Sequence, residues 1–257
     1  MHQSENVDLL RRRSLRAQSP SILNAYKNKS RTFLLAKRAF DIFSSLLVIA
    51  LVLWWLLPIL AILIKLDSAG PVFFVQKRIG LFGRTFNCLK LRTMVVNKQA
   101  DTRQAEKDDP RITALGKFLR LSCIDELPQF FNVLIGDMTV VGPRPHMIKD
   151  CEEFSRQVPA YALRQLMRPG ITGMAQVKGY RGKTEGFFDV FHRYQWDIFY
   201  VRNANFMLDL RIINKTIGQT IKAVFKASEE EMNNSAKKVA TAANGNGEPV
   251  FAELKNA

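Results

Sequence analysis

The sequence predicts a mainly helical α+β protein that carries one small β-hairpin and one apolar membrane segment. Three observations support this fold class. A charge-free apolar run fills residues 42–64, two short strand-like runs flank the turn at Gly80, and helical patterns recur from residue 112 onward. With 257 residues and 47% apolar content, the chain can form one or two domains with a buried core.

The charge of the chain indicates the chemistry of its partners. A formal net charge of +15 and a pI near 10.0 favour a polyanionic partner: nucleic acid, an anionic membrane surface or a phosphorylated substrate. The three cysteines form no CxxC pair and the chain has only three histidines. This usage argues against a disulfide framework or a zinc site and suits a reducing compartment.

Changes in composition divide the chain into four parts. Residues 1–36 are polar and basic, and we expect a tail that is either solvated or lying on anionic lipid. Residues 37–66 contain the membrane segment, and residues 67–226 form a basic body. Residues 227–257 are poor in apolar side chains and are expected to be disordered.

The apolar run IFSSLLVIALVLWWLLPILAILI is long enough for a transmembrane helix, which needs about 20 residues. Pro58 removes a helical hydrogen bond and crowds the carbonyl of Trp54, which predicts a kink there. Basic residues flank both ends, so the positive-inside rule selects no orientation. A kinked span and a re-entrant segment that returns to the same face both fit the sequence.

The body is expected to begin with a hairpin and to continue with helices. The strands are predicted at 72–80 and 85–92, a polar loop or surface helix at 95–111, helices at 112–121, 147–167, 187–202 and 206–225, and a short extended segment at 171–177. The last helix is amphipathic and basic. It could lie in a membrane interface or pack on the body, and both alternatives stay open.

Two adjacent carboxylates, Asp125 and Glu126, precede an apolar run that begins at Pro128. Asp is a favoured N-cap, Pro is tolerated in a first helical turn, and Gly136 is placed to end the helix. We therefore expect both acids at the positive end of a short helix, which lowers carboxylate pKa values and attracts phosphate. Ordinary helix capping would give the same pattern.

The turn Gly142-Pro143-Arg144-Pro145 is expected to be stiff, because proline fixes φ on either side of Arg144. A guanidinium on a rigid loop suits bidentate phosphate binding. The simpler alternative is a turn with an exposed arginine.

Several motifs in unbroken order give the chain a resemblance to a known family. They are KRAFDIFSSLL, GPVFFVQKRIG, FNCLKLRTM, DPRITALGKFLR, LSCIDELPQFFNVLIGDMTVVGPRPH, RPGITGMAQVKGYRG and DIFYVRNANFMLDLRI. Over residues 35–225 the sequence resembles the bacterial sugar transferase family, the monotopic polyprenyl-phosphate sugar-1-phosphate transferases. The continuation through His146 and Met147 resembles the branch that transfers glucose or a related hexose.

The resemblance implies a monotopic membrane protein with a proline-broken re-entrant helix hairpin and interfacial amphipathic helices. Family members often have Ser-Pro at the break, whereas Leu57 precedes Pro58 here, which leaves the kink geometry open. Longer members carry extra N-terminal spans, and this chain resembles the minimal catalytic form with a basic tail.

The resemblance also implies a catalytic pair, Asp125 and Glu126. Asp125 is expected to attack the sugar-bearing phosphorus and to hold Mg²⁺, with Glu126 as a second metal ligand or a base. Candidate substrate-binding residues are Lys90, Arg92, Arg144, Arg181 and Asp209, with Asp197 a weaker candidate.

The expected reaction transfers a sugar-1-phosphate from a UDP-sugar to undecaprenyl phosphate and releases UMP, as the first membrane step of exopolysaccharide, capsule or O-antigen synthesis. The expected location is the bacterial inner membrane, with the catalytic domain on the cytoplasmic face. The expected partners are these substrates and inner-membrane lipid, with no nucleic acid; the oligomeric state is open, a homodimer included. Rival hypotheses are a membrane-tethered basic module that binds nucleic acid or lipopolysaccharide, and a metal-dependent phosphohydrolase.

Overall fold

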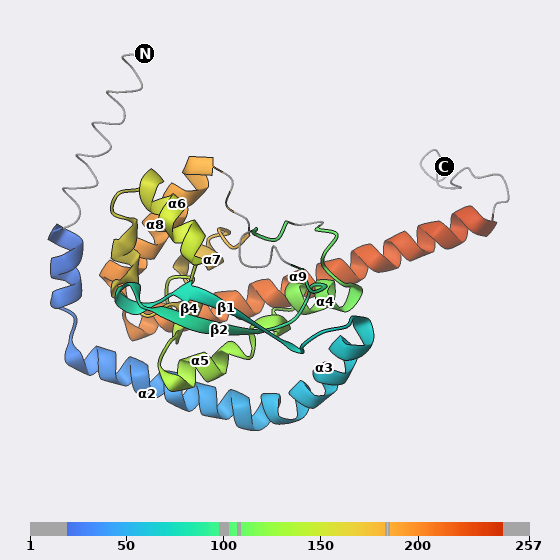
Figure 1. Ribbon diagram of the computed structural model, residues 1–257, viewed down its shortest axis with the longest axis horizontal. Coiled ribbons are helices and arrows are strands. Elements are labelled where there is room, and N and C mark those ends of the chain that lie inside the picture. The colour runs from blue at the N-terminus through green and yellow to red at the C-terminus, as the bar shows by residue number, and fades with distance from the viewer. Residues whose placement is uncertain (1–19, 98–102, 107–108, 183, 185, 244–257) are drawn as a thin grey trace, which may run out of the picture.

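The computed structural model describes residues 20–97, 103–106, 109–182, 184 and 186–243. A long bent helix runs along one side of a small α+β body, and the short helix Gln129–Ile135 lies between this helix and the hairpin (Figure 1). The helices are α2 (Arg31–Val48), α3 (Trp54–Asp67), α4 (Ala114–Leu121), α5 (Gln129–Ile135), α6 (Ile148–Gln157), α7 (Met174–Val177), α8 (Gly186–Asn203) and α9 (Phe206–Ala243). The strands are β1 (Phe73–Ile79), β2 (Thr85–Leu91), β3 (Thr139–Val141) and β4 (Gly170–Thr172).

The long helix consists of α2 and α3 joined by a π-helical segment, Ile49–Leu53. It is one continuous helical stretch of 37 residues, Arg31–Asp67, long and apolar enough to cross a membrane, and only 17% of its most apolar window is buried. A kink was expected at Pro58, which lies inside α3. The π-helical segment lies just before it, where the indole of Trp55 donates a hydrogen bond to the Leu51 carbonyl at 2.8 Å. The irregular hydrogen bonding therefore begins one to two turns earlier than the proline alone predicted.

Polar side chains fasten α2 to the body. The Asp41 carboxylate is buried and accepts hydrogen bonds from Thr139 Oγ1 at 2.7 Å and from the Val140 amide at 2.9 Å. The buried ammonium of Lys37 donates to the Val141 carbonyl at 2.9 Å and pairs with Asp209 at 2.7 Å. These contacts fix the rotation and height of α2 against β3, because buried polar groups are costly unless they are paired.

The other end of the long helix is fastened by apolar packing. Leu60 and Ile64 of α3 form a small buried cluster with Leu91 of β2 and Leu119 of α4. Both ends of the long helix thus contact the same body (Figure 1).

The predicted hairpin is confirmed: β1 and β2 pair antiparallel, from Phe73 opposite Leu91 to Ile79 opposite Thr85. The predicted helix at 112–121 is confirmed as α4, which begins after Thr113, whose side chain accepts a hydrogen bond from the Gly116 amide. The stop at Gly136 is also confirmed, with φ of 98° in the left-handed region that favours glycine.

Several expected boundaries are corrected. The N-terminal tail was expected to extend to residue 36, but residues 20–27 are helical and Ile22 is fully buried in the main core. Residues 1–19 lie outside the described part of the chain. Helix 147–167 divides into α6 and a 3-10 segment, Tyr161–Leu166, because Pro159 cannot continue the hydrogen bonding of α6.

Two further corrections concern the second half of the chain. Within the expected extended segment 171–177, only the start is extended, and α7 follows it. Disorder was expected from residue 227, but α9 continues to Ala243, because residues 227–243 contain strong helix formers and lack both glycine and proline. Residues 244–257 lie outside the described part.

Strands β3 and β4 form a parallel pair that was not predicted. Where the chain leaves these strands, two backbone segments approach so closely that only glycine fits at Gly142, Gly170 and Gly173. A Cβ atom built on Gly170 would lie 2.1 Å from the Gly142 nitrogen, and one built on Gly173 would lie 2.1 Å from the Gly142 carbonyl oxygen. The close approach lets the Gly142 amide donate to the Thr172 carbonyl at 2.8 Å and the Gly170 amide donate to the Pro143 carbonyl at 3.0 Å. The loop that carries Arg144 is thereby fixed.

We expect Gly170→Ala to lower the free energy of unfolding by about 1–3 kcal/mol, the usual cost of overpacking, because backbone atoms cannot yield to the added methyl group. Gly218→Ala is the matched control: nothing lies within 4 Å of its Cβ position, and alanine favours a helix. Chemical unfolding in detergent measures both, and equal stability of the two variants would contradict the prediction.

Candidate active site

Asp125 and Glu126 lie on a 3-10 turn, Ile124–Glu126, between α4 and α5. This corrects the expectation that Asp125 caps the following helix: α5 is preceded by Pro128, with no side-chain cap. Cys123 begins the turn with φ of 59°, a left-handed conformation that is uncommon for a residue other than glycine. The turn directs both carboxylates into a cavity of about 430 Å³.

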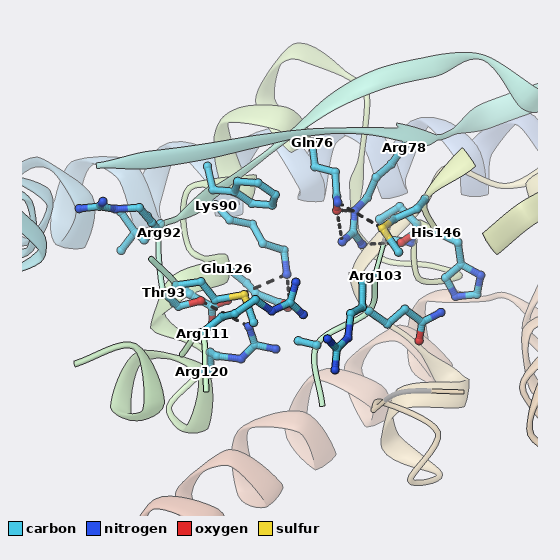
Figure 2. A pocket seen from close by; sticks show the side chains of 18 of the residues that line it. Gln76, Arg78, Lys90, Arg92, Thr93, Arg103, Arg111, Arg120, Glu126 and His146 are labelled. Atoms are coloured by element: carbon cyan, nitrogen blue, oxygen red, sulfur yellow. Dashed lines mark hydrogen bonds and ion pairs between the residues drawn. The ribbon is translucent and has the colours of Figure 1, made fainter. Parts of the chain in front are cut away.

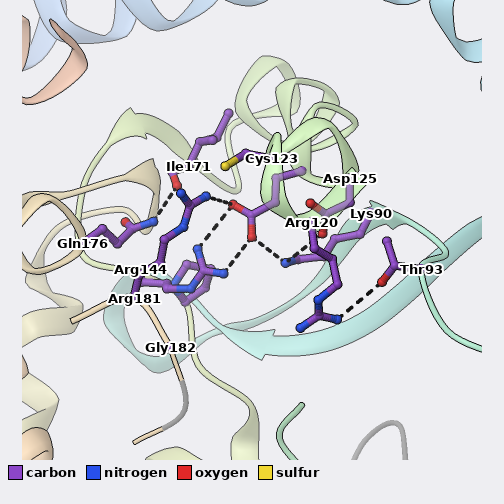
Figure 3. Close-up of polar contacts among 12 residues, drawn as sticks. Lys90, Thr93, Arg120, Cys123, Asp125, Arg144, Ile171, Gln176, Arg181 and Gly182 are labelled. Atoms are coloured by element: carbon purple, nitrogen blue, oxygen red, sulfur yellow. Dashed lines mark hydrogen bonds and ion pairs between the residues drawn. The ribbon is translucent and has the colours of Figure 1, made fainter. Parts of the chain in front are cut away.

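Three cations surround the Glu126 carboxylate. They are Lys90, Arg144 and Arg181, which are labelled in Figure 3. Its Oε1 atom lies 2.7 Å from Lys90 Nζ and 2.7 Å from an Arg144 guanidinium nitrogen. Its Oε2 atom lies 3.3 Å from the other terminal nitrogen of Arg144 and 3.7 Å from Arg181. Burial opposes ionisation of Glu126, but Arg144 and Lys90 outweigh this effect and hold the pKa of Glu126 well below its usual range.

Asp125 has a different environment. Its Oδ2 atom lies 4.0 Å from Lys90 Nζ, beyond hydrogen-bonding distance, and the residue is 7% exposed. Burial therefore raises the pKa of Asp125, although Lys90 partly counteracts the effect. Neighbouring carboxylates thus acquire opposite shifts: Glu126 is a fixed anion within a cation cluster, and Asp125 is a more basic carboxylate.

Contacts from several elements position the cations. Asn132 on α5 accepts a hydrogen bond from the Leu89 amide at 2.9 Å and donates to the Asn87 carbonyl at 2.8 Å, which ties α5 to the strand that carries Lys90. A guanidinium nitrogen of Arg164 donates to the Arg144 carbonyl at 2.6 Å, and Arg164 pairs with the buried Asp197 at 2.7 Å. Asp197 therefore acts on the loop of Arg144 through Arg164.

The structure brings together five of the residues that were selected from the sequence: Lys90, Asp125, Glu126, Arg144 and Arg181. Arg92 lines the cavity, but its guanidinium donates to the carbonyls of Ile64, Ser68 and Ala69 and so holds the C-terminal end of α3. The expected substrate-binding role of Asp209 is corrected. Asp209 is absent from the described cavity lining and forms a buried cluster with Lys37 and Tyr200 instead, because it faces α2.

Sequence reasoning missed several cavity residues. Arg78, Arg120, His146 and Arg193 also line the cavity. Their signal in the sequence was weak, because arginines spread over a basic chain do not reveal which of them converge. The local pattern could have indicated Asn132, since an amide inside an apolar helical stripe needs a buried partner.

Asp125 and Glu126 differ in how well they could serve as metal ligands. Both oxygens of Glu126 already face cations, which makes this residue the weaker candidate ligand, and its expected role in binding metal stays a prediction. Asp125 fits, because Mg²⁺ usually binds through one or two carboxylates together with substrate phosphates. Within the described residues, no group of three or more His, Cys, Asp and Glu side chains could hold a metal ion.

The fold and the cavity define a class of protein in which a buried carboxylate pair lies among basic side chains, on a body attached to a long apolar helix. A family model described as bacterial sugar transferase matches residues 32–223. The chain belongs to the bacterial sugar transferase family.

Three relatives illustrate the similarity. A UDP-glucose:undecaprenyl-phosphate glucose-1-phosphate transferase of Klebsiella pneumoniae is 44% identical over 182 residues, covering 70% of this chain and 39% of the relative. A protein of the same name from Caulobacter vibrioides is 45% identical over 184 residues, covering 71% of this chain and 68% of the relative. The exopolysaccharide production protein PSS of Rhizobium leguminosarum bv. phaseoli is 45% identical over 189 residues, covering 72% and 94%. The match thus spans about two fifths of the Klebsiella protein and nearly all of the Rhizobium protein.

We expect Glu126→Gln to lower the free energy of unfolding by about 3 kcal/mol, because it leaves buried cations without their anion. This value is at the lower end of the usual range, since the Arg181 side chain is 38% exposed and partly solvated. The folded-state pKa of Glu126 is depressed, so its stabilisation is complete above its unfolded pKa of about 4.3 and is lost as the pH falls through the folded value. The difference in the free energy of unfolding between the original protein and the Glu126→Gln variant should therefore be constant above about pH 5 and shrink below about pH 4.

Chemical unfolding at a series of pH values measures this difference. Glu152→Gln, which changes an exposed carboxylate on α6, is the control and should show little effect. A difference between protein and variant that does not depend on pH would contradict the assigned role of Glu126.

Proposed function

We propose that this protein transfers a sugar-1-phosphate, glucose-1-phosphate or that of a related hexose, from a UDP-sugar to undecaprenyl phosphate and releases UMP. The observation that carries the proposal is the environment of Asp125. This buried, basic carboxylate lies next to a cation cluster that suits phosphate groups, in a cavity beside the apolar helix. The family and the names of the relatives support the same reaction.

The proposed first step is attack by an Asp125 oxygen on the phosphorus that bears the sugar. The bond between this phosphorus and the bridging oxygen breaks, UMP leaves with that oxygen, and a phosphosugar-aspartate remains. Burial favours this role, because a poorly solvated carboxylate is more basic and more nucleophilic. Arg144, Arg181 and Lys90 would stabilise the charge that develops on the phosphate oxygens.

The proposed second step regenerates Asp125. An oxygen of the lipid phosphate attacks the same phosphorus, the bond to Asp125 breaks, and undecaprenyl-diphosphate-sugar forms. Bound Mg²⁺, held by Asp125 and substrate phosphates, would supply further charge neutralisation. Neither leaving group needs a proton, because UMP leaves as a phosphate anion in the first step and the Asp125 carboxylate leaves in the second. This agrees with the role of Glu126 as a fixed anion rather than a base.

The proposed setting is the bacterial inner membrane, with the body on the cytoplasmic face as part of exopolysaccharide, capsule or O-antigen synthesis. The re-entrant alternative for the long helix is supported by its contacts. The α2 end packs on β3 and the α3 end packs on α4, so both ends return to one body, while the apolar side chains between them are exposed. This arrangement lets a water-soluble nucleotide sugar and a lipid phosphate meet at one interface.

We expect Asp125→Asn to abolish UMP release from UDP-sugar and lipid phosphate, because the amide is a poor nucleophile. Mass spectrometry of the protein after incubation with UDP-sugar alone should detect a phosphosugar adduct that is absent from the variant. Asp137→Asn, a carboxylate outside the described cavity lining, is the control and should retain activity. Full activity of the Asp125 variant would refute the mechanism, and free sugar phosphate as the product would indicate a phosphohydrolase.

Chelation of divalent cations with EDTA should suppress UMP release, and added Mg²⁺ should restore it. The physical reason is that the cation would neutralise non-bridging oxygens that the arginines alone leave partly uncompensated. Unchanged UMP release after exhaustive chelation would show that the arginine cluster suffices. A panel of UDP-sugars in the same assay identifies the donor.

A further inference from the structure

The cavity has two chemically different ends with the carboxylate pair between them. Figure 2 shows Arg92 and Thr93 on one side of Glu126 and Lys90, and Gln76, Arg78 and His146 on the other. The Arg92 end adjoins the long helix, since Arg92 donates to carbonyls at the end of α3. We call the opposite end, formed by Gln76, Arg78, His146, Asp150 and Arg193, the polar end.

Hydrogen bonds within the protein fix the positions of the side chains at the polar end. Arg78 donates to Gln76 Oε1 at 2.8 and 3.1 Å and to the Pro145 carbonyl at 2.7 Å. His146 Nδ1 lies 2.6 Å from the Tyr161 hydroxyl, and its Nε2 lies 3.4 Å from an Arg193 nitrogen. Another Arg193 nitrogen donates to the Gly182 carbonyl at 2.8 Å. These contacts hold the side chains in place before any ligand binds.

One buried donor at the polar end lacks a partner. Arg193 is only 5% exposed, and its Nε atom has no hydrogen-bond partner within the described part of the chain. An unsatisfied buried donor is costly, and it is usually satisfied by water or a ligand. The half-buried Asp150 carboxylate accepts a hydrogen bond from the Gln104 side chain, and the positive charges of Arg78 and Arg193 act on it electrostatically.

The groups at the polar end suit a neutral ligand that carries many hydroxyl groups. A carboxylate accepts hydrogen bonds and guanidinium groups donate them. Burial and the surrounding arginines hold the pKa of His146 well below its usual range, so the ring is neutral. Such mixed donors and acceptors match the alternating hydroxyls of a sugar.

The proposed reaction assigns the ends of the cavity by geometry. In each in-line displacement, the attacking and leaving oxygens lie on opposite sides of phosphorus. UMP therefore leaves from the position that the lipid phosphate later occupies, whereas the sugar stays on phosphorus in both steps. The lipid phosphate must approach from the end of the cavity beside the long helix. The sugar would therefore lie at the opposite, polar end.

We propose that the polar end of the cavity binds the hexose of the donor and selects among sugars, with Arg193 and Asp150 as its specificity-determining residues. This inference rests on the proposed function.

The test measures kcat/KM for UMP release with UDP-glucose, UDP-galactose and UDP-N-acetylglucosamine, together with the inhibition constant of UMP. The variants are Arg193→Lys, which keeps the charge but removes the planar fork, and Asp150→Asn. Arg202→Gln on α8 and Glu152→Gln on α6 are matched controls, because both residues are exposed and lie outside the described cavity lining.

We expect kcat/KM for the preferred sugar to fall roughly tenfold or more in each variant, because a hydrogen bond to a charged group is lost. The preference over the other sugars should narrow, while UMP inhibition stays within about twofold of the original protein. Neither control should change the preference.

Two results would overturn the inference. An unchanged sugar preference with weakened UMP inhibition would assign the polar end to uridine, and no change in either quantity would leave it without a role in binding. If Asp150→Asn fails to fold, Arg193→Lys alone decides. Failure of the original protein to release UMP from any UDP-sugar would instead refute the proposed function.

Discussion

The pairing of one buried carboxylate with three cations organises the candidate active site. Glu126 draws Lys90 from β2, Arg144 from the glycine-rich loop crossing and Arg181 from the loop after α7 to a single point. Without this anion, the three positive charges would repel one another in a partly desolvated cavity. Their convergence also leaves Asp125, the adjacent residue, outside hydrogen-bonding distance of Lys90, which preserves its basicity.

The long helix is held by a second set of buried charges, which is separate from the cavity. Lys37 and Asp41 project from α2 into the body and meet Asp209, Thr139 and backbone groups of β3. The same strand leads directly into the loop that carries Arg144. A rigid connection of this kind sets the distance between the apolar helix and the cations around Glu126, which the proposed reaction between a lipid phosphate and a nucleotide sugar requires.

Local patterns predicted a good part of the fold. The hairpin, α4, α8 and the glycine stop after α5 follow from alternation, helical periodicity and backbone restrictions, which act over a few residues. The predictions that differed depended on distant contacts. The β3–β4 pair joins segments about 30 residues apart. Ile22 lies in a mainly polar and basic part of the sequence and becomes buried only against the folded body. The end of α9 was misjudged because low apolar content was given more weight than helix propensity.

The sequence by itself determined the chemistry that is present: an acid pair, a rigid arginine loop, a charge-free helix and a large excess of positive charge. Only the tertiary structure decided which cations surround Glu126, why Arg92 and Asp209 serve the long helix, and where Arg193 and His146 meet. The physical reason is the distance along the chain over which each effect acts. Residue type and spacing fix local conformation, whereas the pKa and the partners of a buried charge depend on groups brought together by the packing of the whole chain.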